Sequence, residues 1–449
     1  MRALTTDMTT GDPVRHIIRF ALPALAGNIF QQIYNLADSI IVGRFVGANA
    51  LAAVGATASI TFLFFALCNG ISSGGGVVVS QFYGADDRES VKNCIFNTGF
   101  IMLLIPLIFG IIGFISAPGI LRVLSTPAEI LSDAILYIRC ISAGLLFVSL
   151  YNYLAAMLRA LGDSRTPLYF LILSAIVNIV LDLVLVCVFK MGIMGAALAT
   201  VFSQFISVIC CAVFAARTNP FFRFQSRNMH ISGQILLKII RLGVPMSLQF
   251  GMIAISTMAV QRITNSYGTV VVAAFTATSR IEQLIHQPYT TLGMSISTFC
   301  GQNFGARRFD RVMAGYRKGL LIMISITAVM VIVMQCFGGA ITSLFVTDPE
   351  VIALGAAGLR VTSLFYAALG LIYVVRGVLT GIGDALFSLL NGIIEVAGRF
   401  TIPILITKYL GMGEIGIWVS TGIVWVLSGV TAWMRHHFHT PKIFRLHGH

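Results

Sequence analysis

The stretch Gln81-Phe82-Tyr83-Gly84-Ala85 occurs a second time in this chain in altered form, as Gln302-Asn303-Phe304-Gly305-Ala306. The second copy begins 221 residues after the first, and the same offset relates Gly162-Asp163 to Gly383-Asp384. An offset of 222 residues relates Pro23 to Pro245. Matches that keep the same order along the chain indicate an internal repeat of two similar halves.

The composition predicts that both halves lie in a membrane. Hydrophobic residues make up 57% of the chain and charged residues only 10%, whereas a typical soluble domain carries about 25% charged residues. Apolar stretches long enough to cross a bilayer, about 20 residues each, predict helical spans. They lie near 16–42, 51–82, 93–117, 130–158, 166–189, 192–216, 238–266, 270–302, 314–345, 351–379, 385–407 and 414–435. The chain is therefore predicted to be an all-α integral membrane protein with twelve transmembrane helices.

The two halves are predicted to form two six-helix bundles. Each half contains six of the twelve spans, and an even number gives both halves the same orientation, as a parallel internal repeat requires. The expected parts are an N-terminal lobe at 1–216, a cytoplasmic linker at 217–237, and a C-terminal lobe with a cytoplasmic tail at 238–449. Two bundles that face each other across a cleft suit transport by alternating access.

Basic residues predict the orientation in the membrane, because Lys and Arg accumulate in cytoplasmic loops. Alternate loops are basic, for example around Arg88, Arg159 and Arg308. Both termini are therefore expected in the cytoplasm, with the protein in the inner, cytoplasmic cell membrane. This topology and anionic lipid account for the net charge of +13, so no nucleic-acid partner is expected. No small-residue cleavage pattern precedes the first span, and no removable signal peptide is expected.

Two predicted spans of the N-terminal half carry polar residues in rows along one helical face. In the first span these are Asn28, Gln31, Asn35 and Asp38, with Tyr34 beside them, and in the fifth they are Ser174, Asn178 and Asp182. The repeat partners of Asp38, Asn178 and Asp182 are Ala259 or Val260, Arg399 and Pro403. The polar cluster is therefore expected in the N-terminal half alone.

Asp38, Asn178 and Asp182 are predicted to bind a proton or a sodium ion. A carboxylate at the bilayer centre costs about 2.5–3.5 kcal/mol even on lenient scales, so it indicates a function. Two carboxylates in one water-poor cavity repel each other, and protonation relieves the repulsion. Carboxylate and amide oxygens also suit a small hard cation. The alternative is a hydrogen-bonded pair of neutral acids that only holds the bundle together. Pro23 removes one backbone hydrogen bond and gives the first helix a place to bend.

At these positions the chain resembles the multidrug and toxic compound extrusion (MATE) family over essentially its whole length. The resemblance rests on Pro23, on the stretch Ala37-Asp38-Ser39-Ile40-Ile41-Val42-Gly43, on the Gln-x-x-Gly-Ala turns, on Leu161-Gly-Asp-Ser-Arg-Thr-Pro167, and on Asn178-x-x-x-Asp182. It implies a site in the N-terminal lobe that holds a cation or proton between Asp38, Asn178 and Asp182, completed by Tyr137 and Thr200. One branch of the family pairs acids in the seventh and tenth helices. The seventh span here has no acid, which implies the DinF-like branch.

Two further intramembrane acids, Glu282 and Glu395, lie in the C-terminal half. They either form structural ion pairs, since Arg399 follows Glu395 by one turn and Arg280 is near Glu282, or line a cleft for cationic substrates. The predicted substrate cleft comprises Gln31, Tyr34, Asn35, Glu282 and Glu395.

The repeat, the acids and the resemblance predict a secondary active antiporter. It is expected to export amphipathic, cationic drugs or other toxic organic compounds in exchange for protons or sodium ions, as a monomer and without a cofactor. The chain contains no G-x-x-x-x-G-K-[ST] loop, so direct use of ATP by this chain is not expected.

Other function classes remain as alternatives. A flippase or exporter of a lipid-linked or anionic metabolite would use intramembrane arginines, and the sequence offers Arg262, Arg280, Arg376 and Arg399. A membrane enzyme is not expected, because the sequence has no metal-spaced His cluster and no nucleophile with an adjacent base. A channel fits a repeat of two bundles less well than alternating access does.

Overall fold

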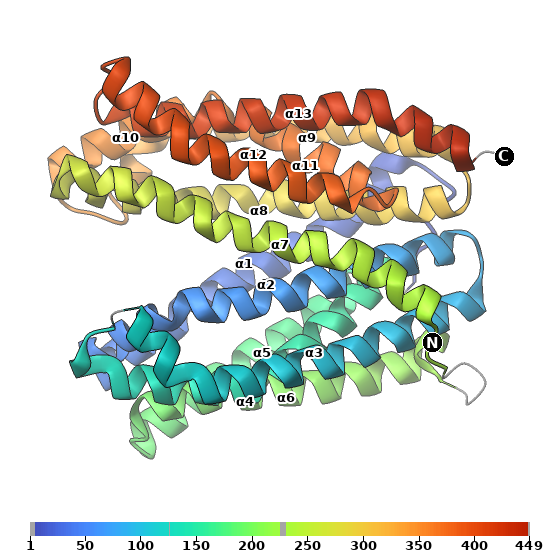
Figure 1. Cartoon of the computed structure of the whole chain (residues 1–449), viewed down its shortest axis with the longest axis horizontal. Helices are drawn as coiled ribbons and strands as arrows, with labels where there is room; N and C mark the ends of the chain where they lie inside the picture. The colour runs from blue at the N-terminus through green and yellow to red at the C-terminus, as the bar shows by residue number, and fades with distance from the viewer. Residues whose placement is uncertain (1–4, 125, 225–229, 448–449) are drawn as a thin grey trace. The chain divides into compact units, whose positions relative to one another are not determined.

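The structure is a computed structural model that describes residues 5–124, 126–224 and 230–447. Every regular element in these ranges is a helix (Figure 1). The first half contains α1 (Pro13–Ile41), η1 (Val42–Val46), α2 (Ala48–Gly84), α3 (Arg88–Val123), α4 (Ala128–Ala160), α5 (Arg165–Asp182), η2 (Leu183–Val188), α6 (Gly192–Thr218) and η3 (Pro220–Phe222). The second half contains α7 (Gly233–Thr264), η5 (Asn265–Tyr267), α8 (Thr269–Gly305), α9 (Phe309–Thr342), α10 (Pro349–Ser363), α11 (Tyr366–Gly381), α12 (Ala385–Ile404), η6 (Leu405–Tyr409) and α13 (Ile415–His447).

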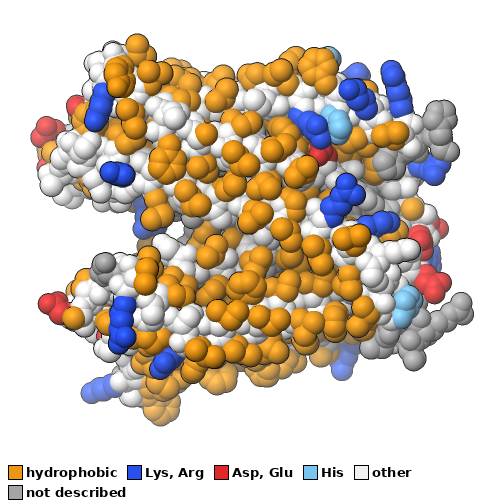
Figure 2. Space-filling view, viewed as in Figure 1, with side chains coloured by type: hydrophobic (Ala, Val, Ile, Leu, Met, Phe, Trp, Pro, Cys, Tyr) orange, Lys and Arg blue, Asp and Glu red, His pale blue; other side chains and the backbone are white. Residues whose placement is uncertain are grey.

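Every predicted span coincides with helix, although not all the helices are equally apolar. Within the described ranges, nine helices are long and apolar enough to cross a membrane, or ten if the bent pair α10 and α11 is one span. That pair corresponds to the predicted span at 351–379 and bends by 50°. The helices α1 and α8 are not among these ten, and they contain Asp38 and Glu282. Figure 2 shows hydrophobic side chains over the middle of the helices on the visible face, with most charged side chains toward the helix ends.

The backbone confirms the internal repeat. Residues with a positive φ angle, a conformation that favours glycine, recur at an offset of 221 residues. The pairs are Gly47 with Gly268, Asp86 with Arg307, Gly162 with Gly383, Lys190 with Gly411, and Gly192 with Gly413. The helices α2 and α8 also begin and end at positions related by this offset. The two halves therefore turn at the same places.

The residues form two compact units. Unit 1 comprises Met1–Asp7 and Leu22–Leu248, and unit 2 comprises Met8–Ala21 and Gln249–His449. Both α1 and α7 therefore contribute to both units, and each changes unit near a proline, Pro23 or Pro245. The division predicted from the sequence placed most of α7 in the C-terminal lobe. That domain division stays a prediction, and residues 225–229 of the predicted linker lie outside the described residues.

The first half of α7 packs tightly within unit 1. Ser247 donates a hydrogen bond from Oγ to the Leu67 carbonyl of α2 at 2.9 Å. A Cβ atom at Gly70 would lie 2.5 Å from the Ser247 Cα, and one at Gly74 would lie 2.7 Å from the Gly243 Cα. Glycines spaced by four residues thus let the two backbones approach closely, as small residues do between helices in membranes.

Aspartates in the loops start several helices, and one repeated pair differs between the units. Asp163 accepts hydrogen bonds at 3.0 Å from the backbone N–H groups of Arg165 and Thr166 at the start of α5. Burial raises the pKa of the Asp163 carboxyl, while these hydrogen bonds act in the opposite direction. Its repeat partner Asp384 instead forms a salt bridge with Arg435, with 2.9 Å between Oδ2 and Nε. The repeat preserves the acid but not its partner.

Candidate functional site

Asp38 and Asp182 meet inside unit 1. Asp38 lies in the last turn of α1 and Asp182 is the last residue of α5. Both helices continue as π-helical segments, η1 and η2, which contact each other. This contact brings the two helix ends together, and the carboxyl groups of Asp38 and Asp182 lie within hydrogen-bonding distance. Short π-helical segments are frequent at functional sites.

Asn178 joins this pair to α6. The side chains of Asn178 and Asp182 are fully buried. With its amide nitrogen facing Asp182, Asn178 donates a hydrogen bond to Asp182 Oδ2 at 2.9 Å and accepts one from the backbone N–H of Thr200 at 3.2 Å. This orientation satisfies both ends of the amide, and such networks are the usual basis for assigning it. The i, i+4 spacing predicted for Asn178 and Asp182 thus becomes a direct contact.

Two tyrosines complete the group. Tyr34, one turn before Asp38 on α1, forms a hydrogen bond with the Thr200 side chain. Tyr137 on α4 lies close enough to Asp38, Tyr34 and Asp182 to interact with them electrostatically. The structure therefore brings together all five residues predicted for ion coupling. It also adds Tyr34, which the sequence had assigned to the substrate cleft.

Two carboxylate oxygens of this site have no hydrogen-bond partner. They are Asp38 Oδ1 and Asp182 Oδ1, and both are buried. Buried polar atoms are normally paired, so an unpaired one indicates a place for a proton, an ion or water. None of the salt bridges among the described residues involves either aspartate. The site can thus relieve the repulsion between its acids by taking up a positive charge.

Gln31 and Asn35 lie beside this group on α1. Gln31 donates a hydrogen bond to Asn35 Oδ1 at 3.3 Å, so these two residues share a helical face as the sequence predicted. Asn35 is exposed on the surface. Their predicted role in binding substrate stays a prediction.

A profile of the MatE family matches the chain twice, over residues 23–184 and 245–402. The chain belongs to the MatE family. Each match covers most of one repeat, in agreement with the repeated backbone. The chain is 32% identical over 445 residues to the probable multidrug resistance protein YpnP of Bacillus subtilis, covering 98% of both chains. It is 29% identical over 422 residues to the probable multidrug resistance protein YoeA of the same organism, covering 92% of this chain and 91% of YoeA.

Solved structures of MatE-like proteins share the whole fold. A crystal structure described as MATE in the straight conformation superposes with a TM-score of 0.92 at 25% identity, covering 98% of this chain and all of that chain. This similarity confirms the predicted all-α fold of twelve membrane helices. The MatE family consists of multidrug efflux transporters, so this chain is a multi-pass membrane transporter of small molecules and not an enzyme. The assignment to the DinF-like branch stays a prediction.

Unit 2 of this MatE transporter contains a different polar group. Arg399 Nη2 and Glu395 Oε1 on α12 form a salt bridge at 3.2 Å, with only 13% and 14% of their side chains exposed. The structural ion pair considered for Glu395 is therefore present. The corresponding pair of Glu282 with Arg280 is not among the salt bridges in the described part of the chain. Glu282 instead interacts with Thr362 of α10 and with Arg399.

His286, one turn after Glu282 on α8, belongs to the same group, and the sequence analysis missed it. It interacts electrostatically with Arg399 and Glu395, and its ring packs against Trp425 of α13 with 5.7 Å between centroids. A histidine four residues from an acid within an apolar helix could have identified it. Arg376 of α11 donates a hydrogen bond to Asn391 Oδ1 at 2.7 Å.

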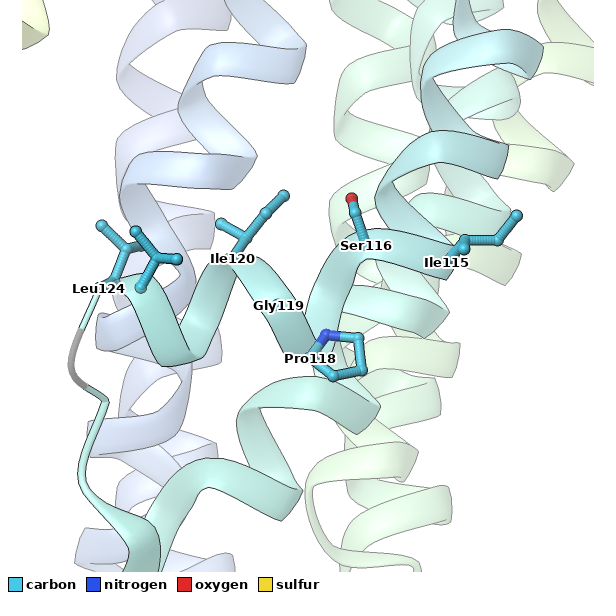
Figure 3. A pocket seen from close by; sticks show the side chains of 7 residues that line it. Ile115, Ser116, Pro118, Gly119, Ile120 and Leu124 are labelled. Atoms are coloured by element: carbon cyan, nitrogen blue, oxygen red, sulfur yellow. The ribbon is translucent and has the colours of Figure 1, made fainter.

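A hollow of about 490 Å³ lies away from both polar groups (Figure 3). It is formed by the end of α3 and lined by Ile115, Ser116, Pro118, Gly119, Ile120, Val123 and Leu124. Its one polar side chain, Ser116, already donates a hydrogen bond to the Ile112 carbonyl of its own helix at 2.6 Å. The hollow therefore presents an apolar surface without groups for chemistry or ion binding.

Proposed function

We propose that this MatE transporter is a secondary active antiporter, which exports amphipathic, cationic organic compounds in exchange for protons or sodium ions by alternating access. The observation that carries the proposal is the buried contact between Asp38 and Asp182, each with one carboxylate oxygen that lacks a partner. Two such acids favour a positive charge between them. The transporter lies in the cytoplasmic membrane as a monomer with both termini in the cytoplasm, and it needs no nucleic acid and no cofactor besides the coupling ion.

Either coupling ion is compatible with the side chains of the site. A proton needs only one carboxylate and can be shared by the pair. A sodium ion needs several oxygen ligands, and the described residues contain no group of three or more His, Cys, Asp or Glu side chains placed to hold a metal. The two aspartates would therefore need the oxygens of Asn178 and of hydroxyl groups such as Thr200 to complete a sodium shell.

Ion binding acts on transport through α1 in this proposal. Asp38 lies in the last turn of α1, and Pro23 interrupts the hydrogen bonding of the same helix near the point where it passes from unit 2 to unit 1. A charge change at Asp38 alters how the end of α1 packs against α5. Pro23 gives the helix a place to bend in response.

Export of a lipid-linked or anionic metabolite is a second candidate. One observation favours it: the Nε atoms of Arg376 and Arg399 in unit 2 are buried and have no hydrogen-bond partner. Guanidinium groups bind carboxylates and phosphates strongly when their donors are free. In this reading Glu282 and Glu395, predicted to line a cleft for cations, would instead hold the arginines in place.

Efflux from proteoliposomes tests the proposal. Purified protein is reconstituted, a fluorescent cationic dye is loaded, and the proton and sodium gradients are imposed independently. We expect dye movement that follows one of the two ion gradients and stops when that gradient is removed. A protein that moves no cationic dye under either gradient, but moves an anionic one, would transfer the assignment to the second candidate.

A further inference from the structure

The polar group in unit 2 has more unpaired buried atoms than a structural ion pair requires. Glu282 Oε1, His286 Nε2, Tyr366 Oη and Arg399 Nε are buried without a hydrogen-bond partner, and they come from α8, α11 and α12. A group that only held these helices together would normally satisfy its polar atoms, since each unsatisfied one costs about 1–3 kcal/mol. The arrangement therefore indicates a site that changes state.

One guanidinium lies between two carboxylates in this group. Arg399 uses Nη2 to pair with Glu395 at 3.2 Å, while its Nε has no partner. Glu282, on α8, interacts electrostatically with the same guanidinium and keeps Oε1 unpaired. Arg399 can therefore pair with Glu282 through atoms that are now free. The carboxylate that it leaves would be buried without a counter-charge, which is unfavourable unless that carboxylate takes up a proton.

The other charged and titratable groups around Glu282 do not provide that counter-charge. Arg376 of α11 is held by Asn391 at 2.7 Å and lies over the ring of Tyr373, with 5.7 Å to its centroid. Tyr366 of α11 and His286 of α8 face Glu282 and Arg399, respectively, as uncharged groups. In α10, Glu350 and Arg360 are exposed. The part of α9 from Gly319 to Thr342 contains no Asp, Glu, His, Lys, Arg or Tyr.

We propose that unit 2 holds a proton-binding site of its own, in which Glu282 and Glu395 share the guanidinium of Arg399 and the carboxylate without it carries a proton. In the structure that carboxylate is Glu282. When Arg399 moves to Glu282, the proton leaves Glu282 and a proton binds to Glu395, so the charge of the group is unchanged. His286 Nε2 offers an acceptor through which the proton can pass. This site is separate from the coupling site proposed in unit 1.

Infrared difference spectroscopy on the purified, full-length protein in lipid tests the proposal without any substrate. A pH step between about 8 and about 5 changes the protonation of groups that titrate in this range, and each protonated carboxylic acid adds a carbonyl stretching band. We expect the Glu282→Gln variant to lose one band that the double variant Asp38→Asn, Asp182→Asn retains. Glu350→Gln, which removes an exposed acid of unit 2, serves as the control and should leave that band unchanged.

A second variant keeps the test decisive if Glu282→Gln does not fold. In Glu395→Gln the guanidinium of Arg399 is free to pair with Glu282, so the Glu282 carboxyl should stay ionised and the same band should disappear. A spectrum that keeps all its bands in whichever of these variants folds overturns the proposal. The proposal is also overturned if the band is kept while binding of the cation tetraphenylphosphonium is lost, because Glu282 then contacts substrate. Loss of bands in the Asp38 and Asp182 variants concerns only the site in unit 1.

Discussion

The polar groups of unit 1 and unit 2 occupy equivalent helices but balance their charge in opposite ways. The repeat places Ser174 and Asn178 of α5 at the positions of Glu395 and Arg399 of α12. In unit 1 two acids meet with no salt bridge to either. In unit 2 an acid and a guanidinium pair within one helix. A site that must accept a cation keeps its negative charge unbalanced, whereas an internal counter-ion removes the need for one.

The largest effect is expected from Asp38→Asn. The amide keeps the size of the side chain and most of its hydrogen bonds but cannot change between charged and neutral forms. Ion-driven dye efflux from proteoliposomes should fall to the level of empty liposomes, while the protein remains folded and inserted. Glu350→Gln serves as the control and should transport normally. Full transport by Asp38→Asn would remove Asp38 from the mechanism and with it the contrast between the units.

Asp182→Asn should also impair coupling strongly, and it should do so without adding to the effect of Asp38→Asn. The two acids touch, so they act as one group and their effects are not additive. Glu395→Gln should chiefly change substrate range or expression. Efflux rates of the two single aspartate variants and the double variant give the comparison. An equal loss of ion coupling in Asp182→Asn and Glu395→Gln would show that both units couple to the ion.

The next effect concerns the linkage between ion and substrate. If the ion and tetraphenylphosphonium favour different states of the transporter, each weakens the affinity of the other by the same factor, typically about 5–150-fold. The affinity for tetraphenylphosphonium should therefore fall as sodium rises, or as the pH falls from about 8 to about 5. Asp38→Asn should flatten this dependence without abolishing binding. Equilibrium binding to the purified protein measures it, and an affinity that never changes with sodium or pH would contradict the proposed coupling.

A smaller effect on stability is expected in unit 2. Removing one partner of a buried salt bridge usually costs about 3–5 kcal/mol. Glu395→Gln should cost less than this, because Arg399 retains Glu282 as a second carboxylate. The double variant Glu282→Gln, Glu395→Gln should cost more than the two single variants together, by about 0.5–3 kcal/mol. Unfolding of the purified variants in detergent measures the free energies, and additive costs would show that Arg399 does not serve both acids.

The smallest effect should be equal in the two units. Gly47 and Gly268 are repeat partners with φ angles of 119° and 92°, and both have open space where a Cβ atom would lie. Substitution of either by Ala should cost about 1–2 kcal/mol, since only the backbone is strained. Gly55 in α2 also has open space, so Gly55→Ala is the matched control and should be neutral or stabilising by about 0.5–1 kcal/mol. Clearly unequal costs at Gly47 and Gly268 would mean that the repeated turns differ in their surroundings.

The sequence predicted much of the site of unit 1 and less of the group in unit 2. Asp38, Asn178 and Asp182 stand out because charged and amide side chains are rare in apolar helices. Tyr137 and Thr200 are ordinary residues in their own helices, and only the family resemblance pointed to them. His286 was missed although its spacing from Glu282 was visible. The assumed partner of Glu282 was also wrong, because nearness in sequence suggested Arg280 whereas the folded chain presents Arg399.

The sequence by itself determined the helices, the membrane setting and the repeat. These follow from composition, from the length of apolar stretches and from residues that recur at a fixed offset, all of which act locally along the chain. Only the tertiary structure decided which side chains meet. The contact of Asp38 with Asp182 depends on how α1 packs against α5, and the position of Arg399 between two acids depends on α8 and α12. Helical periodicity fixes the face on which a residue lies, but the distance between two faces is set by the packing of all the side chains between them.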